Sequence, residues 1–422
     1  MQISSLYGRF PRRTVLAACS AALLVGFAGC GAPEAEFRGN LVYVHRKAEE
    51  SNTKFEPQQQ ADIANILAAY FGTPDDPHMP QIPGLELNGV VDGDRLKMSA
   101  GRVASDRTGQ PVGLYREHCV HCHGITGDGA GPTAAFLNPY PRDYRMGRFK
   151  FKSTLKGQRP THDDLKRILM EGVAGTAMPS FKVLDGDEVE SLVHYVKYLA
   201  IRGEVERRLT DELADLDEGA RLIGDASDKE KDPAAYQEKV NRLNEIVTEV
   251  AQAWIEADGQ AVAIEERSAG WKEPDALQAS IARGREIFYG PIANCVKCHG
   301  DSALGDGQVT DYDDWTKEIE PTKPEALEKY LSLGALPPRN IRPRNLRLGI
   351  YRGGRRPIDL YWRIVNGIDG TPMPAVPMQT PDNAKGLTQD DVWSLVDYVL
   401  SLPYEAMSKQ DKNQPQLDRE RL

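Results

Sequence analysis

Two copies of one short motif, Cys-x-x-Cys-His, constrain the fold of this chain more than any other feature of its 422 residues. The copies occupy residues 119–123 and 295–299, and a glycine follows each of them. On a helix, residues three and four positions apart share a face, so both thiols can reach the edge of one flat macrocycle while the histidine lies under its centre. The spacing therefore predicts covalent attachment of two haem c groups, one at each motif.

Each motif is followed further along the chain by Gly-Thr-x-Met-Pro, which contains Met178 in the first copy and Met373 in the second. A thioether is a soft ligand that suits iron, and His/Met ligation raises the reduction potential. Ligation by one histidine and one methionine also fills both axial positions of the iron. The predicted covalent attachment residues are Cys119, Cys122, Cys295 and Cys298, and the predicted axial ligands are His123, Met178, His299 and Met373.

The two copies also share a Pro-Arg pair, which places Arg142 and Arg344 at equivalent positions. A haem carries two propionates, and the planar guanidinium fork suits a carboxylate. Propionate binding and simple surface exposure both remain open for these two arginines. His162 and His194 could in principle compete for the iron, but we expect them to be exposed or helix-surface histidines.

The first 29 residues have the pattern of an export signal of the lipoprotein type, with a basic start and an apolar run from 15 to 28. The run ends in Phe-Ala-Gly-Cys, which resembles a lipobox, so Cys30 is the predicted lipidation site. A plain cleaved signal is the alternative. This pattern predicts a bacterial periplasmic or cell-envelope protein held to a membrane by a lipid anchor.

The fold class predicted from these patterns is all-α, with two haem-binding domains in tandem. Residues 57–71 have helical spacing between Pro57 and Gly72, while residues 113–115 are interpreted as the end of a helix that leads into the first motif. An apolar stripe at 240–250 predicts a helical hairpin. The predicted organisation is a signal peptide (1–29), a mostly helical N-terminal extension (30–104), domain 1 (105–202), an acidic helical linker (203–279), domain 2 (280–405) and a disordered tail (406–422).

Both units resemble class I c-type cytochrome domains, with Cys-x-x-Cys-His-Gly near the start and Gly-Thr-x-Met-Pro near the end. The tandem arrangement is similar to the dihaem subunit of cbb-type oxidases. The resemblance implies a helical fold, covalent haem c, His/Met iron and electron transfer. The expected partners are a redox protein donor and acceptor, including a membrane respiratory complex. No small-molecule substrate is expected, and the formal net charge of −10 argues against nucleic-acid binding.

Three other functions compete with that of a non-enzymatic electron carrier. A dihaem peroxidase also has two such motifs, but it needs one haem with an open or displaceable sixth position, which two matched methionine loops disfavour. Paired Cys-x-x-Cys motifs can bind zinc, but zinc would not explain the His-Gly and methionine segments. A thioredoxin-like redox pair lacks the expected alternation of strands and helices.

Overall fold

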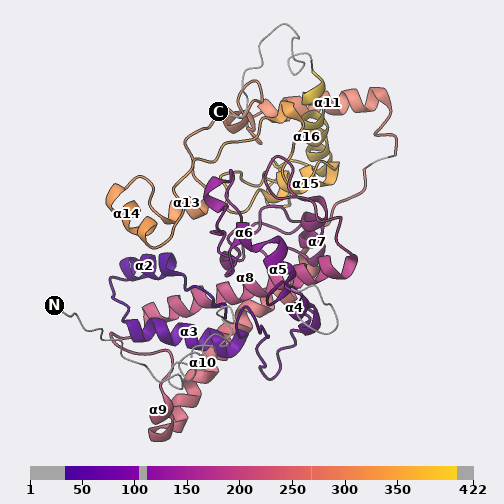
Figure 1. Cartoon of the computed structure of the whole chain (residues 1–422). Helices are drawn as coiled ribbons and strands as arrows, with labels where there is room; N and C mark the ends of the chain where they lie inside the picture. Colours follow the sequence, from indigo (N-terminus) through magenta and orange to yellow (C-terminus); the bar gives the residue numbers. More distant parts are fainter. Residues whose placement is uncertain (1–33, 104–111, 268, 406–422) are drawn as a thin grey trace, which may run out of the picture. The chain divides into compact units, whose positions relative to one another are not determined.

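The computed structural model of the protein describes residues 34–103, 112–267 and 269–405 (Figure 1). These residues form helices joined by loops; they contain isolated bridges but no β-strand, which confirms the all-α prediction. The predicted signal peptide, the lipidation site Cys30 and the predicted tail at 406–422 lie outside the described residues. No helix within the described residues has both the length and the apolar character needed to cross a bilayer.

The N-terminal extension contributes three helices, α2 (Leu41–Glu50), α3 (Pro57–Phe71) and α4 (Gly93–Ser99). Helix α3 has the predicted bounds: Pro57 stands at its first turn, and Gly72 ends it at a φ of 71° that favours glycine. The apolar face of α3 is buried against α8 (Gly186–Asp215). The extension therefore belongs to the core of the first domain.

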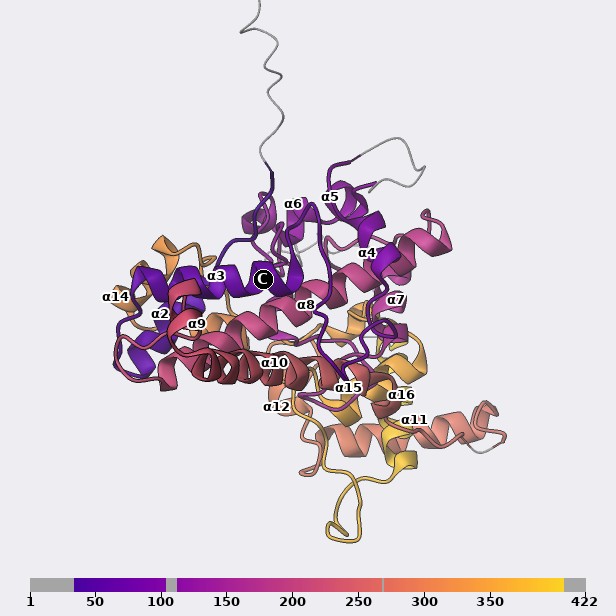
Figure 2. The ribbon, with the colours of Figure 1, turned by 90° about the horizontal axis from the view of Figure 1, so that it is seen from below.

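Helix α8 organises this core, and it runs through residue 202 without a break into the segment predicted as a linker. The start of α8 is capped by Asp185 and Glu188, each of which accepts a hydrogen bond from the backbone N–H of the other. Helix α10 (Pro233–Ile255) packs along α8 with the predicted apolar stripe buried (Figures 1 and 2). At the end of that stripe, the Trp254 indole donates a 2.8 Å hydrogen bond to Glu204 of α8.

The first motif follows α5 (Leu114–His118) directly: Cys119 separates the two helices, and the rest of the motif forms the short α6 (Val120–His123). The expectation that residues 113–115 end a helix is wrong. Gly113 adopts a left-handed conformation (φ 71°) and precedes the first residue of α5, so a helix begins there. The remaining elements of this part of the chain are η1 (Ala134–Phe136), η2 (Tyr144–Met146), α7 (His162–Glu171), α9 (Ala226–Lys231) and η3 (Ala257–Gln260).

The second domain has its own buried core around the crossing of α11 (Pro274–Tyr289) and α16 (Gln389–Ser401). Gly284 makes this crossing possible, because a Cβ atom at this position would overlap the carbonyl oxygen of Ser394. The other elements are α12 (Val296–His299), α13 (Asp314–Glu318), α14 (Pro324–Ser332), η4 (Leu346–Leu348), α15 (Pro357–Asn366) and η5 (Leu402–Tyr404).

The second domain has a longer connection between its motif and its methionine than the first, and this insertion forms α13 and α14. Helix α14 lies beside α2 of the N-terminal extension in both views (Figures 1 and 2). The Tyr330 hydroxyl donates to Glu49 at 3.2 Å, and its ring meets His45 edge-on at a centroid distance of 5.4 Å. The insertion therefore contacts the extension directly.

Candidate haem sites

Each Cys-x-x-Cys-His motif closes into one helical turn. The backbone N–H of His123 donates to the carbonyl of Cys119 at 2.9 Å, and His299 bonds Cys295 at the same distance. All four motif thiols are free, so none is used in a disulfide. Burial raises the pKa of Cys119 to about 12 and that of Cys295 to about 11, which keeps these thiols protonated at neutral pH.

Both motif histidines are fixed by the same kind of hydrogen bond. Nδ1 of His123 lies 3.0 Å from the carbonyl oxygen of Arg142, and Nδ1 of His299 lies 3.2 Å from that of Arg344. An Nδ1–H donated to a carbonyl leaves the Nε2 lone pair free for a metal, as in many metal-ligating histidines. Burial lowers the pKa of His123 to about 4 and also lowers that of His299, so both imidazoles are neutral at neutral pH.

The glycine after each motif is required by the turn that follows. Gly124 and Gly300 have φ values of 74° and 78°, and a Cβ atom on either would overlap the carboxylate of Asp128 or Asp306. The chain then folds back over the histidine: the N–H of Gly129 donates to the His123 carbonyl at 3.0 Å, and the corresponding bond in the second copy measures 2.8 Å. The two loops are therefore the same structure built twice.

The two methionine loops match bond for bond. In the first, the Thr176 hydroxyl donates to the Val173 carbonyl at 2.7 Å and accepts from the Met178 N–H at 3.1 Å. The Met178 carbonyl in turn accepts from the Val173 N–H at 3.1 Å. The second loop repeats these three bonds at 2.8, 3.2 and 3.1 Å with Thr371, Ile368 and Met373. Each loop is thus pinned at the residue that carries the sulfur.

The two arginines hold the motif histidines through their backbone carbonyls, and their side chains are half-buried. The Arg142 guanidinium lies over the Trp315 ring at 3.9 Å, and burial lowers its pKa to about 10. Arg344 Nε is buried with no hydrogen-bond partner among the described residues, as are Arg352 Nε and the Trp315 indole nitrogen. Buried donors without partners are rare and need an acceptor.

These features fit a haem. Each motif turn carries two free thiols and an imidazole whose Nε2 is available for iron. Each domain also has a methionine loop held by hydrogen bonds. The buried donors without partners would suit the haem carboxylates. The sequence could not predict which residue accepts the hydrogen bond from the motif histidine, because every residue type has a backbone carbonyl. The repeated Pro-Arg pair was the one signal that marked this position.

The expectation for the two other histidines holds in part. His162 is partly exposed, but the expectation is wrong for His194, which is buried with an exposed fraction of 7%. Both lie close to Glu190. The cluster was not predicted from the sequence, because it joins Glu190 and His194 of one helix to His162, which lies 28 residues before Glu190 on another helix.

Two segments of the chain, each containing one motif, match known protein families. Residues 106–196 match the family model described as cytochrome c oxidase, cbb3-type, subunit III, and residues 281–403 match the family model described as cytochrome c. No curated protein matches the chain. Among solved structures, a chain of the reducing HAO-like protein complex of Kuenenia stuttgartiensis is similar, with 23% identity and a TM-score of 0.44 over 68% of this chain and 93% of that one.

The two family matches define a protein of the c-type cytochrome class. The chain belongs to this family as a tandem cytochrome, with one cytochrome c domain around each Cys-x-x-Cys-His motif. Such domains bind haem c and transfer electrons, and they are typical of compartments outside the cytoplasm. The two domains agree with the predicted count of two haem groups.

Proposed function

We propose that the protein is a dihaem c-type cytochrome that carries single electrons between redox partners of the bacterial cell envelope. The observation that supports this most is the bond-for-bond match of the two histidine turns and the two methionine loops. Two equivalent sites favour one chemistry at both haems. Haem c would supply reversible one-electron redox chemistry.

In this proposal, Cys119, Cys122, Cys295 and Cys298 attach the two haems, and His123 with Met178 and His299 with Met373 supply the axial ligands. The carbonyls of Arg142 and Arg344 hold the imidazoles in the ligating tautomer. Their half-buried guanidiniums would pair with haem propionates, and in the second site a propionate would supply the acceptor that the orphaned Arg344 Nε–H lacks.

The partners follow from the same chemistry. We infer a redox protein as electron donor and another as acceptor, one of which belongs to a membrane respiratory complex. The match of the first domain to an oxidase subunit family is consistent with electron input to a terminal oxidase. Lipidation at Cys30 would hold the protein at a membrane, and a location in the periplasm or cell envelope agrees with haem c.

The test is a spectrum of the protein matured in a host that attaches haem c. We expect two haem c per chain, both low-spin, with the near-infrared band of methionine-bound ferric haem. Met178→Ala and Met373→Ala should each remove about half of this band, because each loop serves one site. Met146→Ala is the matched control. Met146 also belongs to the first domain, but it does not lie in a Gly-Thr-x-Met-Pro loop, so the band should remain.

Three outcomes would contradict the proposal. A chain that contains zinc and no haem would favour a structural zinc module. A high-spin centre in the wild-type protein would show that one methionine is not a ligand. Substantial turnover of hydrogen peroxide by the half-reduced protein would favour a dihaem peroxidase instead of a carrier.

A further inference from the structure

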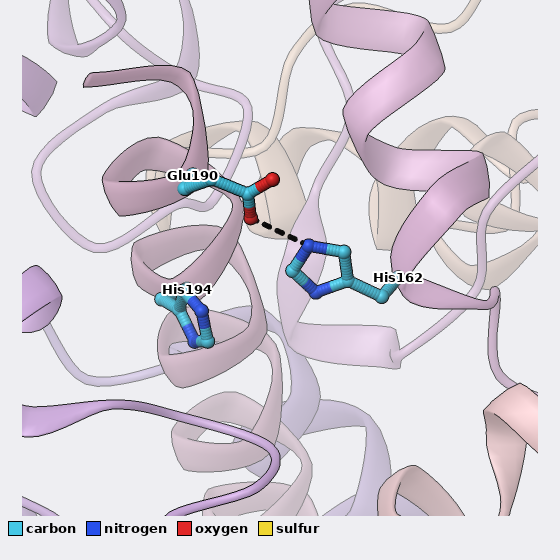
Figure 3. Close-up of side chains that lie close together, drawn as sticks. All are labelled: His162, Glu190 and His194. Atoms are coloured by element: carbon cyan, nitrogen blue, oxygen red, sulfur yellow. Dashed lines mark hydrogen bonds and ion pairs between the residues drawn. The ribbon is translucent and has the colours of Figure 1, made fainter. Parts of the chain in front are cut away.

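Outside the two haem sites, one cluster brings together three side chains that ligate metals. His162, Glu190 and His194 each offer a ligand atom, and these atoms all lie within 4.8 Å of one another (Figure 3). His162 Nε2 lies 2.7 Å from one carboxylate oxygen of Glu190. It is the only such group of three or more His, Cys, Asp or Glu side chains among the described residues.

The cluster is built on two helices. Glu190 and His194 are four residues apart on α8, so they lie one turn apart on the same face. His162 is the first residue of α7, and Figure 3 shows its ring directed toward the Glu190 carboxylate. Positions on rigid helices fix ligands more precisely than positions on loops. Two of the three residues are partly exposed, so an ion can reach them from solvent.

The buried histidine is oriented as a ligand would be. Nδ1 of His194 lies 3.1 Å from the Val90 carbonyl and 3.2 Å from the Asp92 N–H. One nitrogen cannot donate and accept at once, so the two tautomers of His194 compete. Donation from Nδ1 to the Val90 carbonyl leaves the Nε2 lone pair free, which is the pattern of metal-bound histidines. A bound ion would select this tautomer.

Glu190 has one oxygen engaged elsewhere. Lys166 Nζ lies 2.5 Å from Oε1, while Oε2 faces His162. The Lys166 side chain is 43% exposed on a flexible stem, so its ion pair is a weak competitor. Lys197 and Arg95 add positive charge near His194, and Asp163 and Asp258 near Lys197 add negative charge. The local charge is therefore mixed, and the two imidazoles add none when neutral.

The duplicated domain shows that the fold does not require these residues. In the register of the repeat, the positions of His162, Glu190 and His194 are occupied by Pro357, Trp393 and Asp397. Asp397 pairs with arginine and serine side chains there. The same pair of helices is thus held without histidine in domain 2, so the cluster in domain 1 is an addition to a common framework.

We propose that His162, Glu190 and His194 form a binding site for a borderline divalent transition-metal ion, with Zn²⁺ as its representative. Two imidazoles and one carboxylate suit zinc at about 2.0–2.2 Å and leave a fourth position for water. The ion would tie the first turn of α7 to α8. Because α7 ends at Glu171 and leads directly to the loop that carries Met178, the ion would brace the segment that presents this methionine.

The test uses the haem-loaded protein, cleared of metal with a chelator and titrated with Zn²⁺ by calorimetry. We expect one zinc per chain, and Mg²⁺ should give no binding because it prefers oxygen ligands. His162→Asn and Glu190→Gln should each weaken zinc binding at least about tenfold. X-ray absorption at the zinc edge, which is separate from the iron edge, should show two imidazoles in the shell.

His45→Asn is the matched control. His45 and Glu49 form a partly exposed His–Glu pair on α2, 3.3 Å apart, without a second histidine. Its zinc affinity should equal that of the wild type, and the haem spectrum of every variant should be unchanged, which shows that each is folded. Absence of zinc binding, equal weakening by His45→Asn, or a zinc spectrum without imidazole would overturn the site. None of these results would affect the haem assignment.

Discussion

The hydroxyl of Thr176 holds the first methionine loop, and replacing it with valine tests how the structure presents sulfur to the haem. Valine has the same shape as threonine, so Thr176→Val leaves packing intact. It removes the 2.7 Å bond to the Val173 carbonyl and the 3.1 Å bond from the Met178 N–H. Because the second of these bonds involves the methionine itself, the loss should fall on ligation more than on folding.

The magnitude follows from the two bonds. A typical intramolecular hydrogen bond contributes about 1 kcal/mol net, so their loss weakens the bound position of the loop by about 2 kcal/mol. Since 1.4 kcal/mol corresponds to a tenfold change, the equilibrium between the bound and the detached methionine should shift by about 30-fold toward detachment. Added imidazole competes with methionine for ferric iron, so its apparent affinity should rise by the same factor.

The assay is an imidazole titration of the oxidised protein, followed by the near-infrared band. Thr176→Val should produce one tight phase with half of the amplitude, and Thr371→Val should do the same for the other half. Thr380→Val is the control, because its hydroxyl accepts the Asn383 N–H at 3.1 Å in an exposed turn outside both methionine loops. Unchanged affinity in Thr176→Val, or an equal rise in Thr380→Val, would refute the reasoning.

Three further predictions concern stability, measured as urea unfolding of the haem-loaded protein. Gly284→Ala should lower the free energy of unfolding by about 1–3 kcal/mol because its methyl group would overlap the backbone of α16, whereas Gly186→Ala, with no atom within 4 Å, should not lower it. Equal effects of the two changes would contradict this. Burial, with the nearby charges of His162, Lys197 and Arg95, lowers the pKa of His194 from 6.5 to about 4. Because the folded-state pKa of His194 is lower than its unfolded-state pKa, only the unfolded state takes up a proton between pH 6.5 and pH 4. The contribution of neutral His194 to the free energy of unfolding is therefore fully present above pH 6.5 and is lost as the pH falls toward 4. With chelator present, the wild type should therefore lose about 2 kcal/mol more than His194→Gln between pH 7.5 and 5, and parallel pH profiles would disprove it. Trp254→Phe removes the 2.8 Å bond to buried Glu204 and should cost about 1–3 kcal/mol; an unchanged midpoint would show that this bond contributes nothing.

The sequence was most informative where the signal is local. The Cys-x-x-Cys-His turns and the methionine loops each lie within a few residues, so their spacing alone defines the geometry. Helix α3 was equally accessible, because Pro57 and Gly72 mark its two ends. The apolar stripe of α10 was recognised for the same reason, since helical periodicity is a property of one continuous segment.

The packing of these segments against one another could not be predicted from the sequence in the same way. Helix α8 continues for 30 residues through the predicted boundary at 202, and its second half packs on α10, so the predicted linker completes the first core. Contacts such as the one between Trp254 and Glu204 join residues 50 apart. A change in composition near 203 indicated a boundary, but the core is set by which apolar faces meet, and periodicity does not identify the partner of a face.

The comparison of the two repeats both strengthened and limited the prediction of function. It raised Met178 and Met373 above other methionines, because position and local sequence agree in both copies. That comparison could not single out His194, which has no counterpart in domain 2, although the structure buries it beside Glu190. A comparison of two copies identifies only the residues that both domains share, so it cannot identify a residue that serves one domain alone. For a duplicated protein, the features unique to one copy are therefore where the structure adds most to the sequence, and the cluster at the start of α7 is such a feature.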